Sequence, residues 1–438
     1  MDFKEKLLDS HLVFEQDVDL LHPIHKYRKN ALKRFEKDGF PNKSDELWKY
    51  TSLASIVQKD YHLSPISDSN IELKDIKRYF LNDIDSFKLV FIDGVYSPFL
   101  SKTTHDGMDI CVLSAAISKS KYKKTIKKYF NKIVPKNDSL SSLNTSYTKE
   151  GAYILIPKNV EPEDPIQILH FSTGVQNSIW LQPRNLIITE SNSNVQIIER
   201  HQSLSEHKVV TNSVTEIYAE SNSFIDYYKI QNDLLSSSLI DNTFISQEKD
   251  SNVSVHTFSF GGNLTRNNLR FYHKGSNVSS TLKGLTIIES RQHVDHNTLV
   301  NHAKPNCESY QDYKGIFSDS SVGVFNGRII VEKEAQKTNA FQQNDNILTS
   351  DKSKVNTKPQ LEIFADDVKC SHGCTVGQLD KQVLFYVYSR GIPEKEARAL
   401  LTYGFANNVL ESVRIPSLNK KIKKLIASKL GVDLGFDL

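Results

Sequence analysis

The chain has 438 residues, of which 38% are hydrophobic and 24% charged, and its formal net charge is +3. A balance this close to neutral excludes a protein that coats nucleic acid, because that function needs a basic surface. No apolar stretch reaches the roughly 18 residues of a transmembrane helix, no secretory leader opens the chain, and four cysteines are too few for a disulfide scaffold. We therefore expect a cytoplasmic protein with reduced thiols that neither crosses a membrane nor binds nucleic acid.

Residues 1–150 are predicted to form a mainly helical region with a small hairpin. The hairpin is indicated by a strand-like run at residues 88–92 (Lys-Leu-Val-Phe-Ile) that leads into Asp93-Gly94, because this pair accepts the positive φ angles of a tight turn. The segment at residues 41–51, whose aromatics lie at its end (residues 46–51, Glu-Leu-Trp-Lys-Tyr-Thr), predicts a packing or docking site. A helix is indicated by apolar residues at helical spacing and a glycine that ends it: Ile24, Tyr27, Ala31, Phe35 and Gly39.

A polar turn cluster containing Ser-Asn recurs through residues 151–378. The first apolar residues after successive clusters are Val195, Phe224, Val253 and Val278, which lie 29, 29 and 25 positions apart. Only short β-type runs fit between them, which is typical of a β-solenoid, where stacked coils bury what one coil cannot. A large β-sandwich also has regularly spaced strands, but the recurrence of the turn itself favours the solenoid.

Residues 379–438 are predicted to be helical. One helix ends at Gly391, and Pro393 allows a second helix to begin. Such helices either cap an end of the solenoid or bind a partner protein, and the sequence alone favours the cap. The apolar residues of the second helix lie four apart and form one stripe: Ala397, Leu401, Phe405, Val409 and Val413.

Two cysteines and a histidine at the junction of these regions are candidate metal ligands: Cys370, His372 and Cys374. In an extended strand they share one face at spacings of about 6.5–7 Å. A single zinc ion, with bonds of about 2.3 Å to sulfur, needs ligands that lie closer together, so such a site requires a bend at Gly373. The alternative is structural, with the thiols acting as small hydrophobic side chains and His372 as a hydrogen-bonded turn residue.

Three ligands are also one short of a closed zinc or iron–sulfur site. A fourth could come from Asp366, Asp367, a distant residue or another chain. Other chemistry is sparse, since the chain has no P-loop, no dinucleotide-binding glycine motif and no hydrolase nucleophile elbow. The polar residues at 291–296 more often line the polar outside of a strand than catalyse a reaction. Cys111 and Cys307 are predicted to be structural.

Residues 365–373 (Ala-Asp-Asp-Val-Lys-Cys-Ser-His-Gly) and 375–377 (Thr-Val-Gly) resemble the signature of the SufB/SufD family of the SUF iron–sulfur assembly system. Residues 46–51 and 389–392 (Ser-Arg-Gly-Ile) resemble the SufD branch of that family. The resemblance spans the chain in the right order. It implies a mainly β protein with a helical N-terminal region, a right-handed parallel β-helix (β-solenoid) and a C-terminal helical domain.

The resemblance also implies a non-catalytic scaffold for iron–sulfur cluster assembly. In that family a SufD subunit pairs with SufB, and each C-terminal domain binds one SufC ABC-type ATPase. A transient iron–sulfur cluster is shared at the SufB–SufD interface, where the family histidine matching His372 faces a SufB cysteine. Cys370 matches the family cysteine two residues earlier, whereas Cys374 departs from the family pattern and receives no role. The residues expected to contact the ATPase are Arg390, Gly391, Leu401 and Phe405.

Two other functions stay open at this point. One is a carbohydrate-active β-helix enzyme, although no cluster of acidic and basic residues obviously recurs along one solenoid face. The other is a self-contained zinc protein that uses Cys374. If the chain functions in iron–sulfur cluster assembly, we expect the isolated chain to hold no iron–sulfur cluster tightly. A homodimer of the isolated chain is also open.

Overall fold

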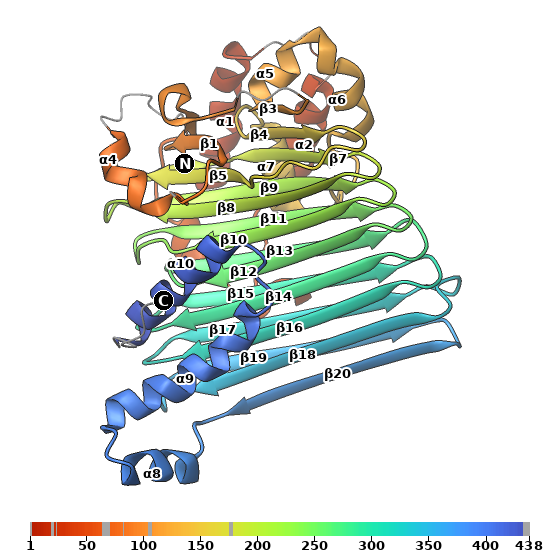
Figure 1. Ribbon diagram of the computed structural model, residues 1–438. Helices are drawn as coiled ribbons and strands as arrows, with labels where there is room; N and C mark the ends of the chain where they lie inside the picture. Colours follow the sequence, from red (N-terminus) through yellow and green to blue (C-terminus); the bar gives the residue numbers. More distant parts are fainter. Residues whose placement is uncertain are drawn as a thin grey trace.

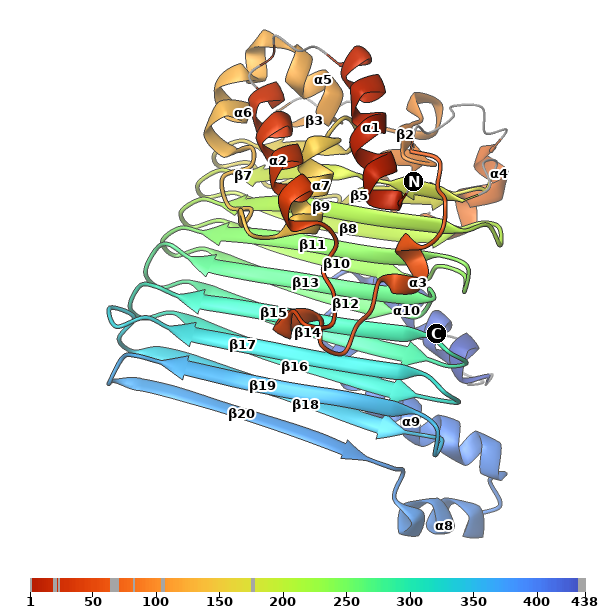
Figure 2. The same cartoon turned by 180° about the vertical axis from the view of Figure 1, so that it is seen from behind.

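The computed structural model describes residues 2–18, 22, 24–63, 71–81, 83–103, 107–174 and 178–431. Its main body is a parallel β-solenoid, in which the chain passes alternately through two sheets (Figures 1 and 2). An N-terminal α/β region and C-terminal helices flank it, so the predicted fold class is confirmed. No helix within these ranges is long and apolar enough to span a membrane.

Each sheet runs along the length of the solenoid. The strands of sheet 1 are, in spatial order, β2 (Val95–Tyr96), β1 (Phe87–Ile92), β5 (Ile166–Ser172), β8 (Asn194–Ser203), β10 (Phe224–Gln231), β12 (Asn252–Ser259), β14 (Ser279–Ile288), β16 (Glu308–Phe317), β18 (Thr338–Leu348) and β20 (Val368–Gly377). Those of sheet 2 are β19 (Lys354–Ile363), β17 (Val322–Val331), β15 (His293–His302), β13 (Leu264–His273), β11 (Ser238–Gln247), β9 (Val209–Ala219), β7 (Arg184–Thr189), β4 (Ala152–Ile156) and β3 (Asp109–Val112), with β6 (Ile179–Leu181) beside β9. The β1–β2 and β3–β4 pairs are antiparallel.

Helices lie before and after the solenoid strands. The N-terminal ones are α1 (Phe3–Gln16), α2 (Ile24–Asp38), α3 (Ala54–Val57), α4 (Leu73–Ile76), α5 (Leu113–Ser118), α6 (Lys123–Tyr129) and α7 (Ser139–Ser146), with short 3-10 turns at Glu46–Trp48, Lys77–Tyr79, Pro98–Leu100 and Ser120–Tyr122. The C-terminal ones are α8 (Lys381–Ser389), α9 (Glu394–Leu410) and α10 (Pro416–Leu430). The predicted helix that Gly39 ends is α2, and the predicted hairpin is β1–β2, whose turn residues Asp93 and Gly94 have φ angles of 47° and 80°.

The recurring turn cluster closes each coil through two kinds of contact. The Ser223 hydroxyl donates to the carbonyl oxygen of Glu220 at 2.6 Å, and equivalent serines do the same in other coils. Asn192 and Asn222 adopt left-handed φ angles of 59° and 56°, which asparagine tolerates better than most residues. Asn222 Nδ2 donates to Asn192 Oδ1 at 2.9 Å across 30 residues, so the asparagines form a ladder between coils. These contacts explain why the cluster repeats in the sequence.

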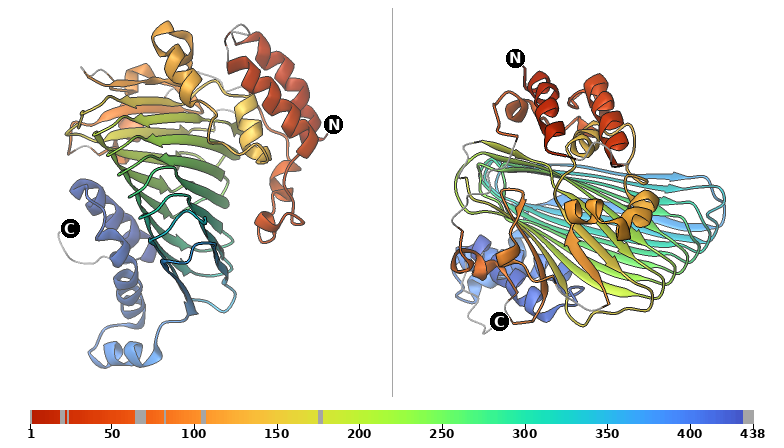
Figure 3. Two further views of the ribbon diagram at one scale, coloured as in Figure 1. Left: turned by 90° about the vertical axis from the view of Figure 1, so that its right-hand side faces the viewer. Right: turned by 90° about the horizontal axis from the view of Figure 1, so that it is seen from above.

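Apolar side chains fill the solenoid interior, and both outer faces are partly covered as well (Figure 3). On sheet 2, residues of α1, α2 and α7 form one cluster with Val210, Ile240 and Leu264. On sheet 1, residues of α9 and α10 pack around Tyr228 and Phe258. The prediction that the C-terminal helices cap the solenoid end is therefore wrong, because α9 and α10 pack on the side of sheet 1 and leave the last coil open.

The aromatic segment at residues 46–51 packs on the outer face of sheet 2, as its composition predicts. The Arg266 guanidinium of β13 lies 3.9 Å from the ring centroid of Trp48, and its Nη2 donates to the carbonyl of Leu47 at 2.8 Å. Arg266 also forms a buried ion pair with Asp295 of β15, and Asp295 accepts a hydrogen bond from Thr51. This segment therefore ties the N-terminal region to the middle of the solenoid.

Candidate functional site

The junction segment with the candidate ligands forms β20, the last strand of sheet 1. Among the described residues β20 is hydrogen-bonded to β18 alone, so its other edge is open (Figure 1). Its register pairs Cys370 with Ala340, and His372 with Gln342. Cys374 is paired in the same way with Asn344.

The candidate ligands lie on the inward face of this last coil. Ala340, Gln342 and Asn344 are all buried between the sheets, and paired residues of parallel strands share a face. His372 is nevertheless exposed, as is Cys374, because no further coil covers them. Cys370 is half-buried and packs against a cluster that includes Ala340 and Ala365. The open end of the solenoid thus presents its inner face to solvent.

Burial shapes the chemistry of the half-buried thiol. Removal from water raises the pKa of the Cys370 thiol, opposed by a backbone hydrogen bond from Ala340. Since the thiolate is the form that binds metal and attacks electrophiles, Cys370 needs a nearby cation or metal to become reactive.

The chain does not gather these residues into a closed metal site. β20 runs unbroken through Gly373, which pairs with Gln343, so the bend that a single-ion site requires is absent. Asp367 is used in a turn, where its backbone N–H donates to Gln336 Oε1 at 2.9 Å. In the described ranges, the clusters of three donors within 4.8 Å of one another are His273–His302–Cys307 and His170–Glu199–His201, both away from β20. Among the residues that the structure describes, no such cluster therefore includes Cys370, His372 or Cys374.

The residues expected to contact the ATPase lie in different environments. Gly391 forms the turn between α8 and α9 with a φ of 84°, and the exposed Arg390 guanidinium lies 5.2 Å from the ring centroid of Tyr386. Leu401 is half-buried. Phe405 packs against the solenoid, with Lys314 Nζ 4.9 Å from its ring centroid, so it helps to fix α9 on sheet 1.

Sequence reasoning missed several exposed apolar side chains on α8 and in the N-terminal half of α9. Phe385 is 72% exposed and Tyr386 is 57% exposed, with Val383 and Leu400 also on the surface. The sequence could have indicated this exposure. Residues 383–388 are apolar or aromatic throughout, and a single helix of nine residues cannot bury all of these side chains. We call Val383, Phe385, Tyr386 and Leu400 the α8 patch.

Interior histidines on neighbouring coils were also missed. His273 and His302 lie one above the other with their Nδ1 atoms 3.2 Å apart, close to Cys307. Their Nε2 atoms lie 2.7 Å from Ser280 Oγ and 2.9 Å from Ser309 Oγ, respectively. Residues this far apart in sequence meet only through the register of the coils.

Two family profiles together match most of the chain. The profile of the family described as "SUF system FeS cluster assembly, SufBD core domain" matches residues 171–405, and that of "SufBD protein N-terminal region" matches residues 9–168. The chain belongs to the SufBD family. It is an iron–sulfur cluster assembly protein of that family, and residues 46–51 and β20 fall within the two matched regions.

Full-length relatives support the assignment to the SufBD family. An iron–sulfur cluster assembly SufBD family protein of Synechocystis is 31% identical over 399 residues, covering 89% of this chain and 87% of the relative. The iron–sulfur cluster assembly protein SufD of Escherichia coli is 29% identical over 409 residues, covering 91% of each chain. The SufD protein of Bacillus subtilis is 27% identical over 396 residues, covering 87% of this chain and 88% of the relative.

Proposed function

We propose that this chain is a cytoplasmic, non-catalytic scaffold subunit that provides half of an iron–sulfur cluster assembly site. A SufB-like paralogue completes the site by docking on the open end of the solenoid, and a SufC-like ABC ATPase binds the C-terminal helices. The observation that carries this proposal is the uncovered last coil, which presents Cys370 and His372 on its inner face. The membership in the SufBD family supports it.

The open end has the features of a surface that a partner covers. β20 is a ten-residue edge strand, and long exposed edges in native proteins are normally blocked or paired. Apolar side chains are exposed around it, including Phe364 at 61%, Ile363 and Val376. A sister chain that adds a strand to β20 would satisfy its unpaired backbone groups and bury these side chains.

A partner also supplies the missing ligands. Iron–sulfur clusters usually need four ligands, most often thiolates, and this end offers Cys370 and His372 with no closed donor set. Because the imidazole is exposed, it can reach a cluster held mainly by the partner. The cluster is therefore transient and shared, and the isolated chain holds none tightly.

The α8 patch is the surface proposed to bind the ATPase. Val383, Phe385 and Tyr386 of this patch are exposed on α8, which projects away from the solenoid (Figure 1), and Leu400 is exposed on α9. Residues 378–380 alone connect β20 to α8, so a displacement of α8 by the ATPase acts directly on the strand that carries His372. Nucleotide energy would reach the assembly site by this route, which agrees with the lack of a P-loop in the chain.

Co-expression tests this proposal. The chain is purified alone and with a SufB-like paralogue and a SufC-like ATPase, and cluster reconstitution is followed anaerobically by absorption spectroscopy and iron and sulfide content. We expect a stable complex that builds a cluster, and an isolated chain, monomeric or homodimeric, that does not. A cluster built and retained by the isolated chain would contradict the proposal. Zinc held by the isolated chain and lost in Cys374→Ser, or turnover of a polysaccharide, would favour the other functions.

A further inference from the structure

Two histidines and a cysteine meet inside the middle coils, at the edge where the chain passes from sheet 2 to sheet 1. His273 ends β13 and His302 ends β15, while Cys307 immediately precedes β16. The strand register pairs the two histidines, so they lie one above the other on neighbouring coils. Each of the three buried residues offers one ligand atom, and these atoms lie within 4.8 Å of one another.

Hydrogen bonds determine which nitrogen of His273 carries the proton. Gln247 Nε2 donates to the carbonyl oxygen of Ser279 at 3.0 Å, so Gln247 Oε1 is free to accept. The Ser280 hydroxyl donates its proton to that Oε1 at 2.6 Å, and Ser280 Oγ lies 2.7 Å from His273 Nε2. The hydroxyl therefore accepts from the Nε2–H of His273. A neutral imidazole with this proton has a lone pair on Nδ1, the nitrogen that faces His302.

Both imidazoles are neutral, which is the form that binds a metal ion. Removal from water lowers the pKa of His273, with a smaller contribution from His302, and lowers the pKa of His302 to about 3. His302 Nε2 lies 2.9 Å from Ser309 Oγ, so a serine hydroxyl stands at the outer nitrogen of each ring. Metal-binding histidines are usually oriented by such a hydrogen bond on their second nitrogen.

The spacing of the donor atoms suits one ion. Bonds of about 2.0–2.1 Å from a tetrahedral zinc ion to two imidazole nitrogens separate these nitrogens by about 3.3–3.4 Å. The two Nδ1 atoms lie 3.2 Å apart. A zinc–sulfur bond of about 2.3 Å places the sulfur about 3.5 Å from each nitrogen, so Cys307 Sγ needs to approach by no more than about 1.3 Å. Only weak contacts oppose this movement, since Sγ lies 3.5 Å and 3.6 Å from the carbonyl oxygens of Gly275 and Pro305.

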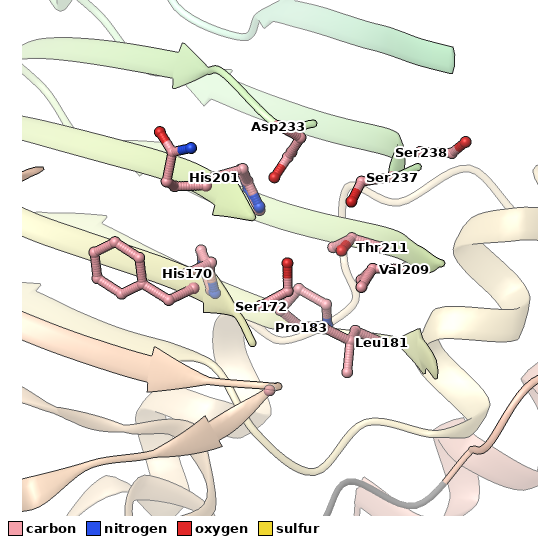
Figure 4. Close-up of a pocket in the computed structure, with 13 residues that line it drawn as sticks. His170, Ser172, Leu181, Pro183, His201, Val209, Thr211, Asp233, Ser237 and Ser238 are labelled. Atoms are coloured by element: carbon pink, nitrogen blue, oxygen red, sulfur yellow. The ribbon is translucent and has the colours of Figure 1, made fainter. Parts of the chain in front are cut away.

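The second interior cluster does not fit a shared ion. The rings of His170 and His201 stack with their planes 9° apart beside the cavity shown in Figure 4, and both imidazoles already face the Glu199 carboxylate. The rings of His273 and His302 instead meet at 79°, with a nitrogen of each ring facing the other. The arrangement of the donors therefore favours the cluster that contains the cysteine.

We propose that His273, His302 and Cys307 bind one transition-metal ion, zinc(II) or copper(I), as a structural cross-link between coils. Mixed imidazole and thiolate ligands bind zinc, and sets of two histidines and one cysteine bind copper. Binding moves the His302 proton from Nδ1 to Nε2, where Ser309 accepts a hydrogen bond from it, and releases the thiol proton to water. Cys307 follows the exposed Asn306, so the ion enters close to the surface. The site is independent of the proposed assembly site at β20.

Metal binding to the full-length chain tests this proposal. Metal-free protein is titrated without oxygen with Zn²⁺, Cu⁺ and, as a spectroscopic probe of the zinc site, Co²⁺. We expect one tightly bound equivalent of Zn²⁺ or Cu⁺ per chain, a melting temperature that rises with its concentration, and a sulfur-to-metal charge-transfer band with Co²⁺. X-ray absorption of the bound ion should show one sulfur and two imidazole nitrogens. No uptake of either ion, or a bound ion without a sulfur ligand, would overturn the proposal even if every substituted chain failed to fold.

Substitutions locate the ion. We expect Cys307→Ser and His302→Gln each to weaken binding at least tenfold, and Cys307→Ser to remove the charge-transfer band. The matched controls are Cys374→Ser, at the open end, and His170→Gln, in the second interior cluster, and both should bind the ion as the original chain does. Loss of the ion from Cys374→Ser would place it at β20 and overturn the proposal. Unchanged affinity in the folded Cys307 and His302 variants would overturn it as well.

Discussion

His372 lies directly beside Gln342 in the register of β20 and β18, and the buried amide of Gln342 has no hydrogen-bond partner among the described residues. The imidazole is exposed while the amide one strand inward is buried. A partner that covers the end would bury both groups and could supply the missing hydrogen bonds. This pair marks the place where the inner face of the solenoid passes from a closed core to an open surface.

Substitution of the exposed imidazole should separate function from stability. We expect His372→Ala to change the free energy of unfolding by less than about 0.5 kcal/mol, because exposed side chains contribute little. Formation of the complex with the SufB-like paralogue should persist, while maturation of iron–sulfur enzymes in cells that depend on this pathway falls at least tenfold. Ser371→Ala, on the opposite face of the same strand, is the control and should mature these enzymes normally. Normal maturation with His372→Ala would remove this residue from the site.

The α8 patch should carry the affinity for the ATPase. We expect Phe385→Ser combined with Tyr386→Ser to weaken ATPase binding at least tenfold, measured by calorimetry on the purified chain, since exposed aromatic anchors dominate many interfaces. Phe99→Ser is the control, because Phe99 is a 98% exposed aromatic residue of the N-terminal region, in the 3-10 turn Pro98–Leu100. Undiminished ATPase binding by the double variant would contradict the assignment of this surface.

Deletion of the chain after Gly391 is a weaker experiment than these substitutions. It removes α9 and α10, whose apolar residues cover Tyr228, Phe258 and Leu285 on sheet 1. The truncated chain would expose that face to water and lose stability, so a loss of ATPase binding could not be assigned to the interface.

The solenoid could be predicted from the sequence because its turns have local requirements. A serine that bonds back three residues and an asparagine with a left-handed φ leave a recurring pattern, as at residues 220–223. The spacing of the β20 ligands could be predicted for the same reason, since strand geometry alone determines it. These features depend on a few neighbouring residues rather than on distant contacts.

Features that depend on the register between coils could not be predicted. The strands under α9 are buried on both faces, so Tyr227 and Tyr228 are equally apolar in sequence while one points inward and the other contacts the C-terminal helices. Nothing local therefore indicated that α9 and α10 cover sheet 1 rather than the end. His170 and His201 likewise meet only because coils of unequal length align them.

The buried ion pair beneath residues 46–51 should matter for stability. We expect Asp295→Ala to lower the free energy of unfolding by about 3–5 kcal/mol, because Arg266 would stay buried beside Trp48 without its carboxylate. Urea unfolding measures the difference. Lys358→Ala removes the exposed pair with Glu46 in the same region and should leave stability unchanged. Equal effects of the two substitutions would show that burial of the Arg266 pair is not what matters.

Acid should weaken the docking of the C-terminal helices through His256. This side chain bonds to Ser412 Oγ at 2.9 Å, and burial, with smaller contributions from Lys283 and Arg414, lowers the pKa of His256 to about 3. The unfolded chain, with a histidine pKa of about 6.5, binds a proton between these values that the folded chain does not, so stability falls as pH decreases below 6.5. For this one group the loss from pH 7.5 to pH 5 is about 2 kcal/mol.

Comparison of unfolding at pH 7.5 and pH 5 checks this effect. The difference in unfolding free energy between the two pH values should be smaller in His256→Gln than in the original chain, because the glutamine does not titrate. Far-ultraviolet circular dichroism at each pH reports whether the helices are lost first. An identical pH dependence in both proteins would show that His256 is not the group that titrates.

Two substitutions of Asn222 separate the contribution of the ladder hydrogen bond to the stability of the turns from that of the left-handed backbone angle. Asn222→Ala loses the hydrogen bond to Asn192 and keeps a β-carbon at a left-handed φ of 56° without the polar side chain that lets asparagine tolerate this angle, which costs about 1–2 kcal/mol for most residues. Asn222→Gly loses the same hydrogen bond but accepts that φ without strain. We expect urea unfolding to show the alanine variant as the less stable of the two by at least about 0.5 kcal/mol, since glycine also increases the entropy of the unfolded chain. If glycine were as destabilising as alanine, the ladder hydrogen bond rather than the backbone angle would be the reason that asparagine occupies this position.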